Sequence, residues 1–241
     1  MLHEIEDLTG VPLHEEITWS TLTVFLASPR IVTPYHIDHE SNFLFQIEGE
    51  KEVCLFDPSD QDLLPAPEIE QFYVGNAEAA NYRSHLQDRG TVYRLTPGMA
   101  VHHPPLAPHW VKNGDGVSVS ASIGFCMRDL DRRAKVHQAN LVLRKLGLHP
   151  QAPGLSRTGD RAKAAVMSVL SKSNPQTQDD LLFSGIRRAV APFRALKRLR
   201  SRVGRLTGGV RGDSRFGLCG AGECAIKCFQ IQDLSNLGDR R

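Results

Sequence analysis

The chain has few cysteines and no long apolar run, and both features narrow the classes of protein to which it can belong. Its 241 residues include five cysteines, two of which, Cys54 and Cys126, fall in or directly after segments that we predict to be strands. An odd, low count is typical of reduced thiols in a cytosolic protein and not of a disulfide framework. No run of 18 apolar residues is present, and the N-terminal MLHEIEDLTG lacks the apolar core of a signal peptide. We therefore expect a cytoplasmic protein with no membrane partner.

A strong charge of either sign is also lacking. The formal net charge is +2, from 29 basic and 27 acidic residues. This balance favours neither nucleic acid nor a membrane surface as a partner. One stretch is uneven, since residues 187–211 hold nine Lys or Arg and no acid. We interpret it as a solvated helix face and not as a nucleic-acid site. Its apolar residues would dock on the β-barrel predicted below or on a second subunit: Ile186, Val190, Phe193 and Val203.

Helical periodicity is nearly absent from the first half of the chain. Short runs rich in β-branched and aromatic residues alternate there with Gly, Pro and Asn, at 18–26, 30–37, 43–47, 52–56, 91–95, 99–103, 109–112 and 117–125. This pattern predicts a mainly β fold, a double-stranded β-helix of the jelly-roll or cupin type. Helical spacing then begins at 129–148 and returns at 160–170 and 178–202, the last interrupted by Pro192. We expect a jelly-roll domain at 1–128, a basic helical extension at 129–203 and a disordered tail at 204–241.

The stretch TPYHIDHESNFLFQIEGEK, residues 33–51, contains the main functional signal. His36 and Asp38 are two residues apart, and on a strand that spacing places both side chains on one face. His109, which begins a later predicted strand, adds a second imidazole. Two histidines and one carboxylate that leave coordination positions open form the facial triad of non-haem Fe(II) oxygenases. The sequence therefore predicts a metal site made by His36, Asp38 and His109.

Other histidines and cysteines are weaker candidates for ligands. His102 and His103 are rivals for the third position, and we expect them to line the barrel or to face solvent. We place His39 on the rim. The remaining thiols match no zinc spacing and lack a nearby fourth ligand: Cys219, Cys224 and Cys228.

Two turn signals suggest hairpins, one at Glu48–Gly49 and one at residues 113–116. A two-residue turn at the first would pair Gln46 with Lys51 and carry the inward face from one strand to the next. A lysine inside a barrel is costly unless it meets an anion. Thr33 would add a hydroxyl to the same anion. The predicted inward residues are His36, Asp38, Asn42, Leu44, Gln46, Lys51, Val53 and Leu55.

The segment from Thr33 to Pro58 resembles the metal and co-substrate strands of the JmjC-type cupin hydroxylases. It is most similar to the factor-inhibiting asparaginyl hydroxylase branch, with T-P-x-H-x-D at 33–38, Asn42, and Q-I-x-G-x-K at 46–51. A second block is similar to the second cupin motif, except that Leu106 stands where cupins usually carry Gly. The residues that match this motif are Gly98, Pro104, His109 and Asn113.

The resemblance implies a particular chemistry. Fe(II) would be held by His36, Asp38 and His109, and 2-oxoglutarate would chelate the metal while Lys51 and Thr33 hold its far carboxylate, with Asn42 nearby. With O2 as the oxidant, the protein would hydroxylate or demethylate a C–H bond of a protein side chain or a small molecule. The alternative is a non-catalytic cupin that binds a metal or a small acid as a regulator. A cupin isomerase or epimerase fits the pattern less well. The C-terminal helices are a candidate homodimer interface.

Overall fold

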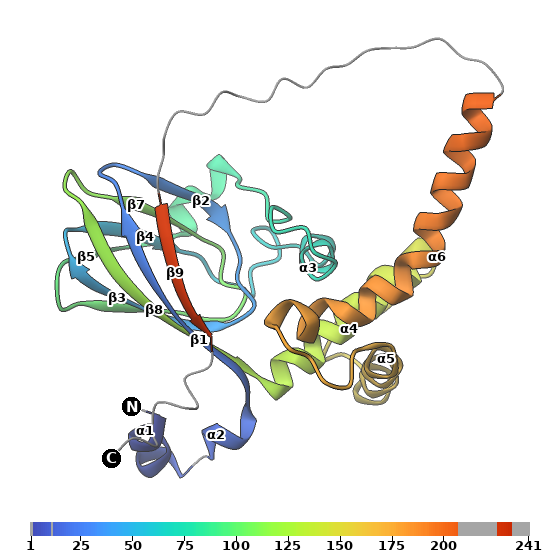
Figure 1. Cartoon of the computed structure of the whole chain (residues 1–241), viewed down its shortest axis with the longest axis horizontal. Coiled ribbons are helices and arrows are strands. Elements are labelled where there is room, and N and C mark those ends of the chain that lie inside the picture. Colours follow the sequence, from blue (N-terminus) through green and yellow to red (C-terminus); the bar gives the residue numbers. More distant parts are fainter. Residues whose placement is uncertain (1, 11, 207–225, 233–241) are drawn as a thin grey trace.

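Two antiparallel β-sheets face each other and form the barrel of this chain. The computed structural model describes residues 2–10, 12–206 and 226–232. One sheet has the strand order β6-β3-β8-β1-β9 and the other β2-β7-β4-β5 (Figure 1). The mainly β jelly roll with helices in the C-terminal part, which the sequence predicted, is confirmed. The strands are β1 Ile17–Ala27, β2 Val32–His36, β3 Ser41–Glu48, β4 Lys51–Leu55, β5 Thr91–Leu95, β6 Ala100–His103, β7 His109–Asn113, β8 Ser118–Met127 and β9 Ile226–Gln232.

The two predicted hairpins are wrong, because both turns are corners that carry the chain from one sheet to the other. β3 pairs with β6 and β8, whereas β4 pairs with β5 and β7. Gln46 therefore lies opposite Ser120 and not opposite Lys51. The turn after Asn113 likewise connects β7 of one sheet to β8 of the other. A turn signal shows where a strand ends but not which strand it pairs with. The predicted inward face is nevertheless observed, since the strand period of two fixes it independently.

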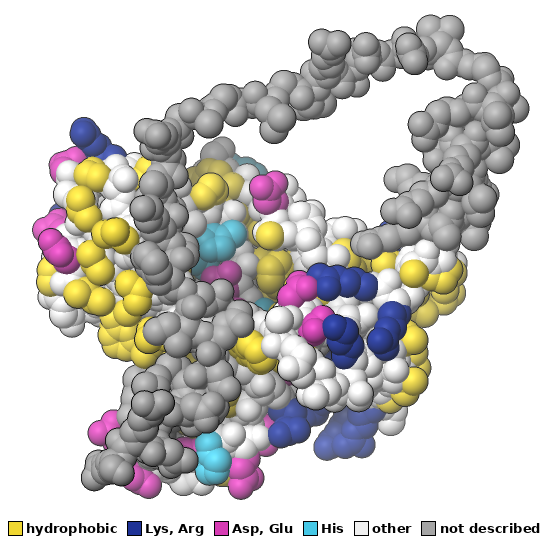
Figure 2. Space-filling model, in the orientation of Figure 1, with side chains coloured by type: hydrophobic (Ala, Val, Ile, Leu, Met, Phe, Trp, Pro, Cys, Tyr) yellow, Lys and Arg dark blue, Asp and Glu magenta, His cyan; other side chains and the backbone are white. Residues whose placement is uncertain are grey.

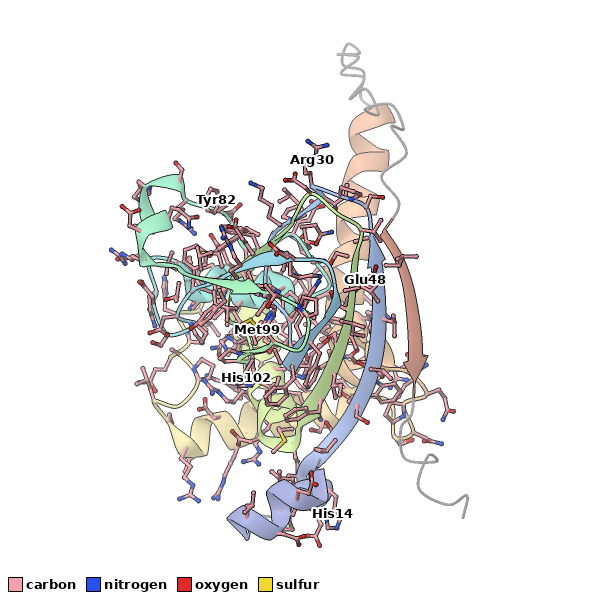
Figure 3. All side chains as sticks on the ribbon, turned by 90° about the vertical axis from the view of Figure 1, so that its left-hand side faces the viewer. His14, Arg30, Glu48, Tyr82, Met99 and His102 are labelled. Carbon is pink, nitrogen blue, oxygen red and sulfur yellow. The ribbon has the colours of Figure 1, made fainter. Side chains whose placement is uncertain are left out.

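Gly49 makes the first corner, next to Glu48 at the end of β3 (Figure 3). Its φ is +73°, and a Cβ at this position would lie 2.3 Å from the carbonyl oxygen of Val117. Gly98 also has a positive φ, +88°, but no atom lies within 4 Å of the corresponding position. A side chain would strain the backbone at either glycine, but only at Gly49 would it also clash with the carbonyl oxygen of Val117.

We expect Gly49→Ala to destabilise the protein more than Gly98→Ala. The backbone strain should cost about 1–3 kcal/mol at either position, and the clash at Gly49 should add roughly another 1–3 kcal/mol. Urea unfolding of the two variants and the wild type measures both values. Equal losses of stability would show that the corner moves to accommodate the extra methyl group.

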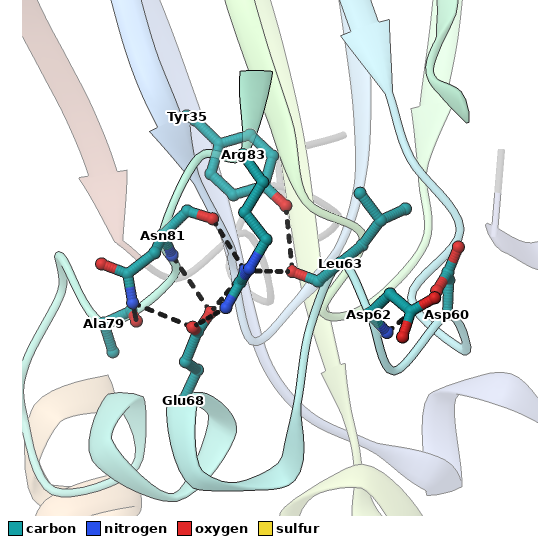
Figure 4. Close-up of polar contacts among 8 residues, drawn as sticks. All are labelled: Tyr35, Asp60, Asp62, Leu63, Glu68, Ala79, Asn81 and Arg83. Atoms are coloured by element: carbon teal, nitrogen blue, oxygen red, sulfur yellow. Dashed lines mark hydrogen bonds and ion pairs between the residues drawn. The ribbon is translucent and has the colours of Figure 1, made fainter. Parts of the chain in front are cut away.

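An insertion between β4 and β5 packs against the strand that carries His36. It contains α3 (Ala66–Phe72) and a 3-10 helix (Ser84–Arg89). Arg83 Nη2 contacts Glu68 Oε1 at 2.5 Å, and Asn81 donates to the same carboxylate through its backbone and side chain (Figure 4). The carbonyl of Leu63 accepts from Arg83 Nη1 at 3.1 Å and from the hydroxyl of Tyr35, on β2, at 3.4 Å. These bonds hold the insertion to β2. Burial alone would raise the pKa of Glu68, but the bonds from Arg83 and Asn81 outweigh it and lower that pKa.

Three helices follow β8: α4 (Arg128–Lys145), α5 (Arg157–Leu170) and α6 (Gln178–Leu206). Their shared core contains Ala139, Met167, Ile186 and Val190. Of the four apolar residues expected to dock on the barrel or on a second subunit, Ile186 and Val190 pack instead against α4 and α5, and the side chain of Val203 lies outside the described part. Lys and Arg side chains gather over this helical part (Figure 2). Pro192 lies inside α6 and does not interrupt it.

The C-terminal segment differs from the predicted disordered tail wherever it is described. Residues 204–206 still belong to α6, and residues 226–232 form β9, which pairs antiparallel with β1 from Thr21 opposite Gln232 to Ala27 opposite Ile226. Residues 207–225 and 233–241, with Cys219 and Cys224, lie outside the described residues. At the other end, α1 (Leu2–Thr9) and α2 (Leu13–Glu16) precede the barrel. Among the described residues, no helix combines the length and apolar character needed to cross a bilayer.

Candidate metal centre

Three predicted ligands meet where β2 ends and β7 begins. His36, the last residue of β2, lies directly opposite His109, the first residue of β7, and their ring centroids are 4.1 Å apart. Asp38 follows two residues later. Its Oδ2 is 3.8 Å from His36 Nε2 and 3.6 Å from His109 Nε2. One ligand atom of each residue lies within 4.8 Å of the others, so a single ion has access to all three.

Hydrogen bonds leave the Nε2 atoms of both imidazoles available to a metal. His36 Nδ1 lies 2.7 Å from the carbonyl oxygen of Pro34, and His109 Nδ1 lies 2.9 Å from that of Ala107. Because a carbonyl can only accept, each Nδ1 carries the proton, and a lone pair remains on Nε2. Metal-binding histidines are typically oriented by such a bond from their other nitrogen.

Burial favours the neutral imidazole that a metal requires. His109 is 3% exposed. Burial, helped by the nearby His36, lowers the pKa of His109 to about 3, against a smaller opposing effect of its bond to Ala107. Burial raises the pKa of Asp38, and the neighbouring His36 partly offsets this. A divalent cation between these groups would favour the ionised carboxylate and leave both histidines neutral.

The three residues open onto a cavity of about 130 Å³ between the two sheets, several times the space of about 10–15 Å³ that one water requires. The predicted residues Thr33, Asn42 and Lys51 all line it. Asn42 Oδ1 accepts a hydrogen bond from Ser122 Oγ at 2.7 Å. The sequence reasoning placed Leu44 on the inward face but did not identify Ser122, Phe25 or Ala27, because these side chains come from β1 and β8, which carry no motif. The remaining lining residues are Phe25, Ala27, Leu44, His103, Val111 and Asn113.

Among the described residues, Lys51 is the one lysine that lines this cavity. The residue is 5% exposed, and burial lowers the pKa of its ammonium group to about 8. In the part of the chain that the structure describes, no side chain forms an ion pair or hydrogen bond with Lys51 Nζ. A buried cation without a protein partner is unfavourable, and an anionic ligand in the cavity would remove that cost.

The other three histidines considered in the sequence analysis lie in different surroundings: His103, His102 and His39. His103 lines the cavity beside His109, with ring centroids 4.5 Å apart, and neither of its nitrogens has a partner among the described residues. His102 is exposed, stacks on Phe43 and contacts Ser41 Oγ at 2.8 Å (Figure 3). The prediction that His39 lies on the rim is wrong, since that residue is 2% exposed. α4 covers His39, and the strand pattern around His39 does not indicate that a helix packs there.

The comparisons with known proteins agree with this architecture. A family model described as "Cupin-like domain" matches residues 3–189. The chain belongs to the cupin-like domain family. A curated relative of this cupin-like domain is rat (Rattus norvegicus) HSPB1-associated protein 1, 28% identical over 153 residues, which cover 56% of this chain and 31% of that protein. The chain therefore spans about a third of the length of that relative.

Solved structures also overlap with parts of this cupin-like domain. A cupin superfamily protein from Desulfitobacterium hafniense is 10% identical, with a TM-score of 0.30, and the match covers 45% of this chain and 69% of that one. The polyketide cyclase RemF from Streptomyces resistomycificus is 20% identical, with a TM-score of 0.29, and the match covers 45% of this chain and 56% of that one.

Proposed function

We propose that this cupin-like domain is an Fe(II)- and 2-oxoglutarate-dependent dioxygenase that hydroxylates or demethylates a C–H bond. The observation that carries the proposal is that Lys51, which is buried and has no side-chain partner among the described residues, lines the same cavity as His36, Asp38 and His109. A metal site alone would suit many cupins. A metal together with an unpaired cation suits a co-substrate that chelates with one end and carries a carboxylate at the other.

The residues present fit both groups. His36 Nε2, His109 Nε2 and the carboxylate of Asp38 would hold Fe(II), for which imidazole and carboxylate are suitable ligands. Lys51 and Thr33 would bind the far carboxylate of 2-oxoglutarate. When bound, iron and co-substrate supply the oxidising chemistry, in which O2 oxidises 2-oxoglutarate to succinate and carbon dioxide and a C–H bond of the substrate to C–OH. The protein supplies orientation and, through apolar walls such as Leu44 and Val111, a cavity that excludes water.

The exposed side of the site favours a substrate presented from solvent. The side chains of His36 and Asp38 are 29% and 33% exposed, whereas that of His109 is 4% exposed. The metal would therefore be covered on the β7 side and open on the β2 side. A protein side chain could reach it there without the rest of the substrate entering the barrel. The sequence motif shared with the asparaginyl hydroxylase branch supports this substrate class.

A regulator that binds metal and acid without turnover is the second candidate, and His103 favours it. Its unpartnered imidazole lies next to His109 at the cavity wall. If His103 joined the metal as a fourth protein ligand, fewer positions would remain for a chelating co-substrate and O2. The coordination number of the bound metal therefore separates the two functions.

The test is an anaerobic titration of the Fe(II)-loaded protein with 2-oxoglutarate, followed by exposure to O2. We expect the metal-to-ligand charge-transfer absorption of an Fe(II)–2-oxoglutarate chelate, and then O2-dependent formation of succinate. Asp38→Ala should give neither signal. An absorption band without succinate, with or without candidate peptides, would support the regulator. Iron binding without any band would rule out both co-substrate chelation and the dioxygenase.

A further inference from the structure

A second group of ligand-type side chains lies where the barrel meets α4. His39 comes from the loop after β2, Cys126 from the end of β8 and Asp131 from the first turn of α4. One ligand atom of each lies within 4.8 Å of the others. The three residues are 2%, 0% and 8% exposed, so the group is more buried than the first centre. None of them belongs to the first centre.

This group is rich in acids and poor in cations. Gln178 Nε2 contacts both Glu40 Oε2, at 3.1 Å, and Cys126 Sγ, at 3.5 Å, which brings a second carboxylate to the thiol. Burial strongly raises the pKa of Cys126, and the nearby carboxylates of Glu40 and Asp131 raise it further. In the described part of the chain, Asp131 forms an ion pair with His39, and neither Asp131 nor Glu40 forms one with a Lys or Arg. Two carboxylates and a thiol therefore lie near one imidazole, and of these four residues only Glu40 is partly exposed.

We propose that His39, Cys126 and Asp131 form a second metal site, specific for Zn²⁺ or a similar borderline-soft cation, with Glu40 as the fourth ligand in place of the Gln178 amide. Nitrogen, thiolate and carboxylate donors are the ligands that Zn²⁺ takes in tetrahedral sites. Binding converts the Cys126 thiol to a thiolate, and its proton leaves to solvent. The cation also offsets the acidic character of the region.

For His39, Cys126 and Asp131 the geometry needs only a small adjustment, whereas Glu40 has to displace the Gln178 amide that separates it from Cys126. His39 Nε2 already lies 2.8 Å from Asp131 Oδ1, and bond lengths of about 2.0–2.3 Å to zinc place neighbouring tetrahedral donors roughly 3.3–3.6 Å apart. His39 Nε2 and Asp131 Oδ1 would therefore move slightly apart on binding zinc, and ligand atoms that are now farther apart than about 3.6 Å would move closer together. His39 Nδ1 lies 2.9 Å from the hydroxyl of Tyr73. That bond keeps the ring orientation fixed, as partners of metal-bound imidazoles do.

The site would fasten three segments at one point: the end of β8, the first turn of α4 and the loop that carries Asp38. Because His39 directly follows Asp38, a metal on His39 would restrict the backbone next to the first centre. The second metal is structural in this arrangement, since the group is buried and leaves no access for a substrate.

Cobalt(II) tests the proposal, because its thiolate complexes have an intense near-ultraviolet charge-transfer band and the first centre contains no sulfur. The protein used carries His109→Ala, which weakens the first centre, and Ser in place of Cys219, Cys224 and Cys228. Cys54 is retained, since it belongs to no ligand group among the described residues. We expect one Co(II) per chain with a thiolate band. Cys126→Ser should abolish the band, and Asp131→Asn should weaken binding at least tenfold.

The proposal would be overturned if this multiple variant, shown to be folded by its cooperative unfolding, gave no thiolate band, or if the band were unchanged after Cys126→Ser. Zinc analysis of the wild-type protein gives an independent measurement that needs no variant. Saturation at one Zn²⁺ per chain instead of two would also contradict it. The dioxygenase proposal is tested through the first centre alone, so either proposal can fail without the other.

Discussion

Replacing His109 by Ala should reduce the affinity for Fe(II) by more than about a hundredfold, since loss of even the hydrogen-bond partner of a ligand costs about 10–100-fold. His109 is the buried member of the three, and only Asp38 and the half-exposed His36 would remain. Anaerobic calorimetry with Fe(II), or metal analysis after desalting, measures the change. A matched control is His102→Ala, which removes an exposed histidine whose side chain contacts Ser41 and Phe43.

The same experiment checks the choice between His109 and His103. We expect His103→Ala to keep its iron, because the structure groups His36 and Asp38 with His109 and not with His103. If His103→Ala lost the metal while His109→Ala kept it, the third ligand would be misassigned. If both variants lost it, the metal would have four protein ligands, as the regulator requires.

Replacing Lys51 by Ala should weaken 2-oxoglutarate binding by a factor of ten to more than a hundred and leave Fe(II) binding largely unchanged. A charge-assisted hydrogen bond contributes about 1.5–3 kcal/mol, which corresponds to this range. Lys51→Arg should also bind poorly, because a planar guanidinium does not reproduce a point charge in a fitted cavity. The measurement is the anaerobic charge-transfer titration of each iron-loaded variant. Lys112→Ala is a suitable control, since it removes an exposed lysine from the neighbouring strand.

The pH dependence gives a second check on Lys51. Because burial lowers the pKa of this ammonium to about 8, the free protein carries the charge below that pH and loses it above. The affinity for 2-oxoglutarate should therefore fall as the pH rises past 8, and in Lys51→Ala this decline should be absent. Identical titrations of wild type, Lys51→Ala and Lys51→Arg would place the carboxylate contact elsewhere in the cavity.

The sequence indicated which side chains gather around the first centre because most of their positions follow simple geometric rules. A spacing of two points Asn42 and Leu44 of β3 into the cavity, and along β4 it puts Lys51, which lines the cavity, on the same face as the core residue Val53. Asp38 reaches the same cavity two residues beyond His36, the last residue of β2. These rules are local, so they held even though the partners of β3 and β4 were predicted wrongly. Strand pairing depends on contacts between distant segments, and the glycine turn at Gly49 is compatible with both a hairpin and a corner.

The second group could not be found in this way, since its members share no spacing. His39, Cys126 and Asp131 come from a loop, a strand and a helix, and only the packing of α4 against the barrel brings them together. His39 was expected on the rim because the helix that covers it begins some 90 residues later. Likewise, nothing in the weakly patterned segment around Ile226 indicates that it pairs with β1.

The position of β9 has a practical consequence for work with this protein. β9 lies at the edge of its sheet and covers one side of β1 along Thr21–Ala27. A chain shortened before residue 226, for instance to isolate the barrel from α5 and α6, would leave the N–H and C=O groups of that side of β1 unpaired. Bare strand edges recruit strands from other molecules. Such a fragment should self-associate, and an internal deletion that rejoins the chain ahead of β9 is the better route to a monodisperse barrel.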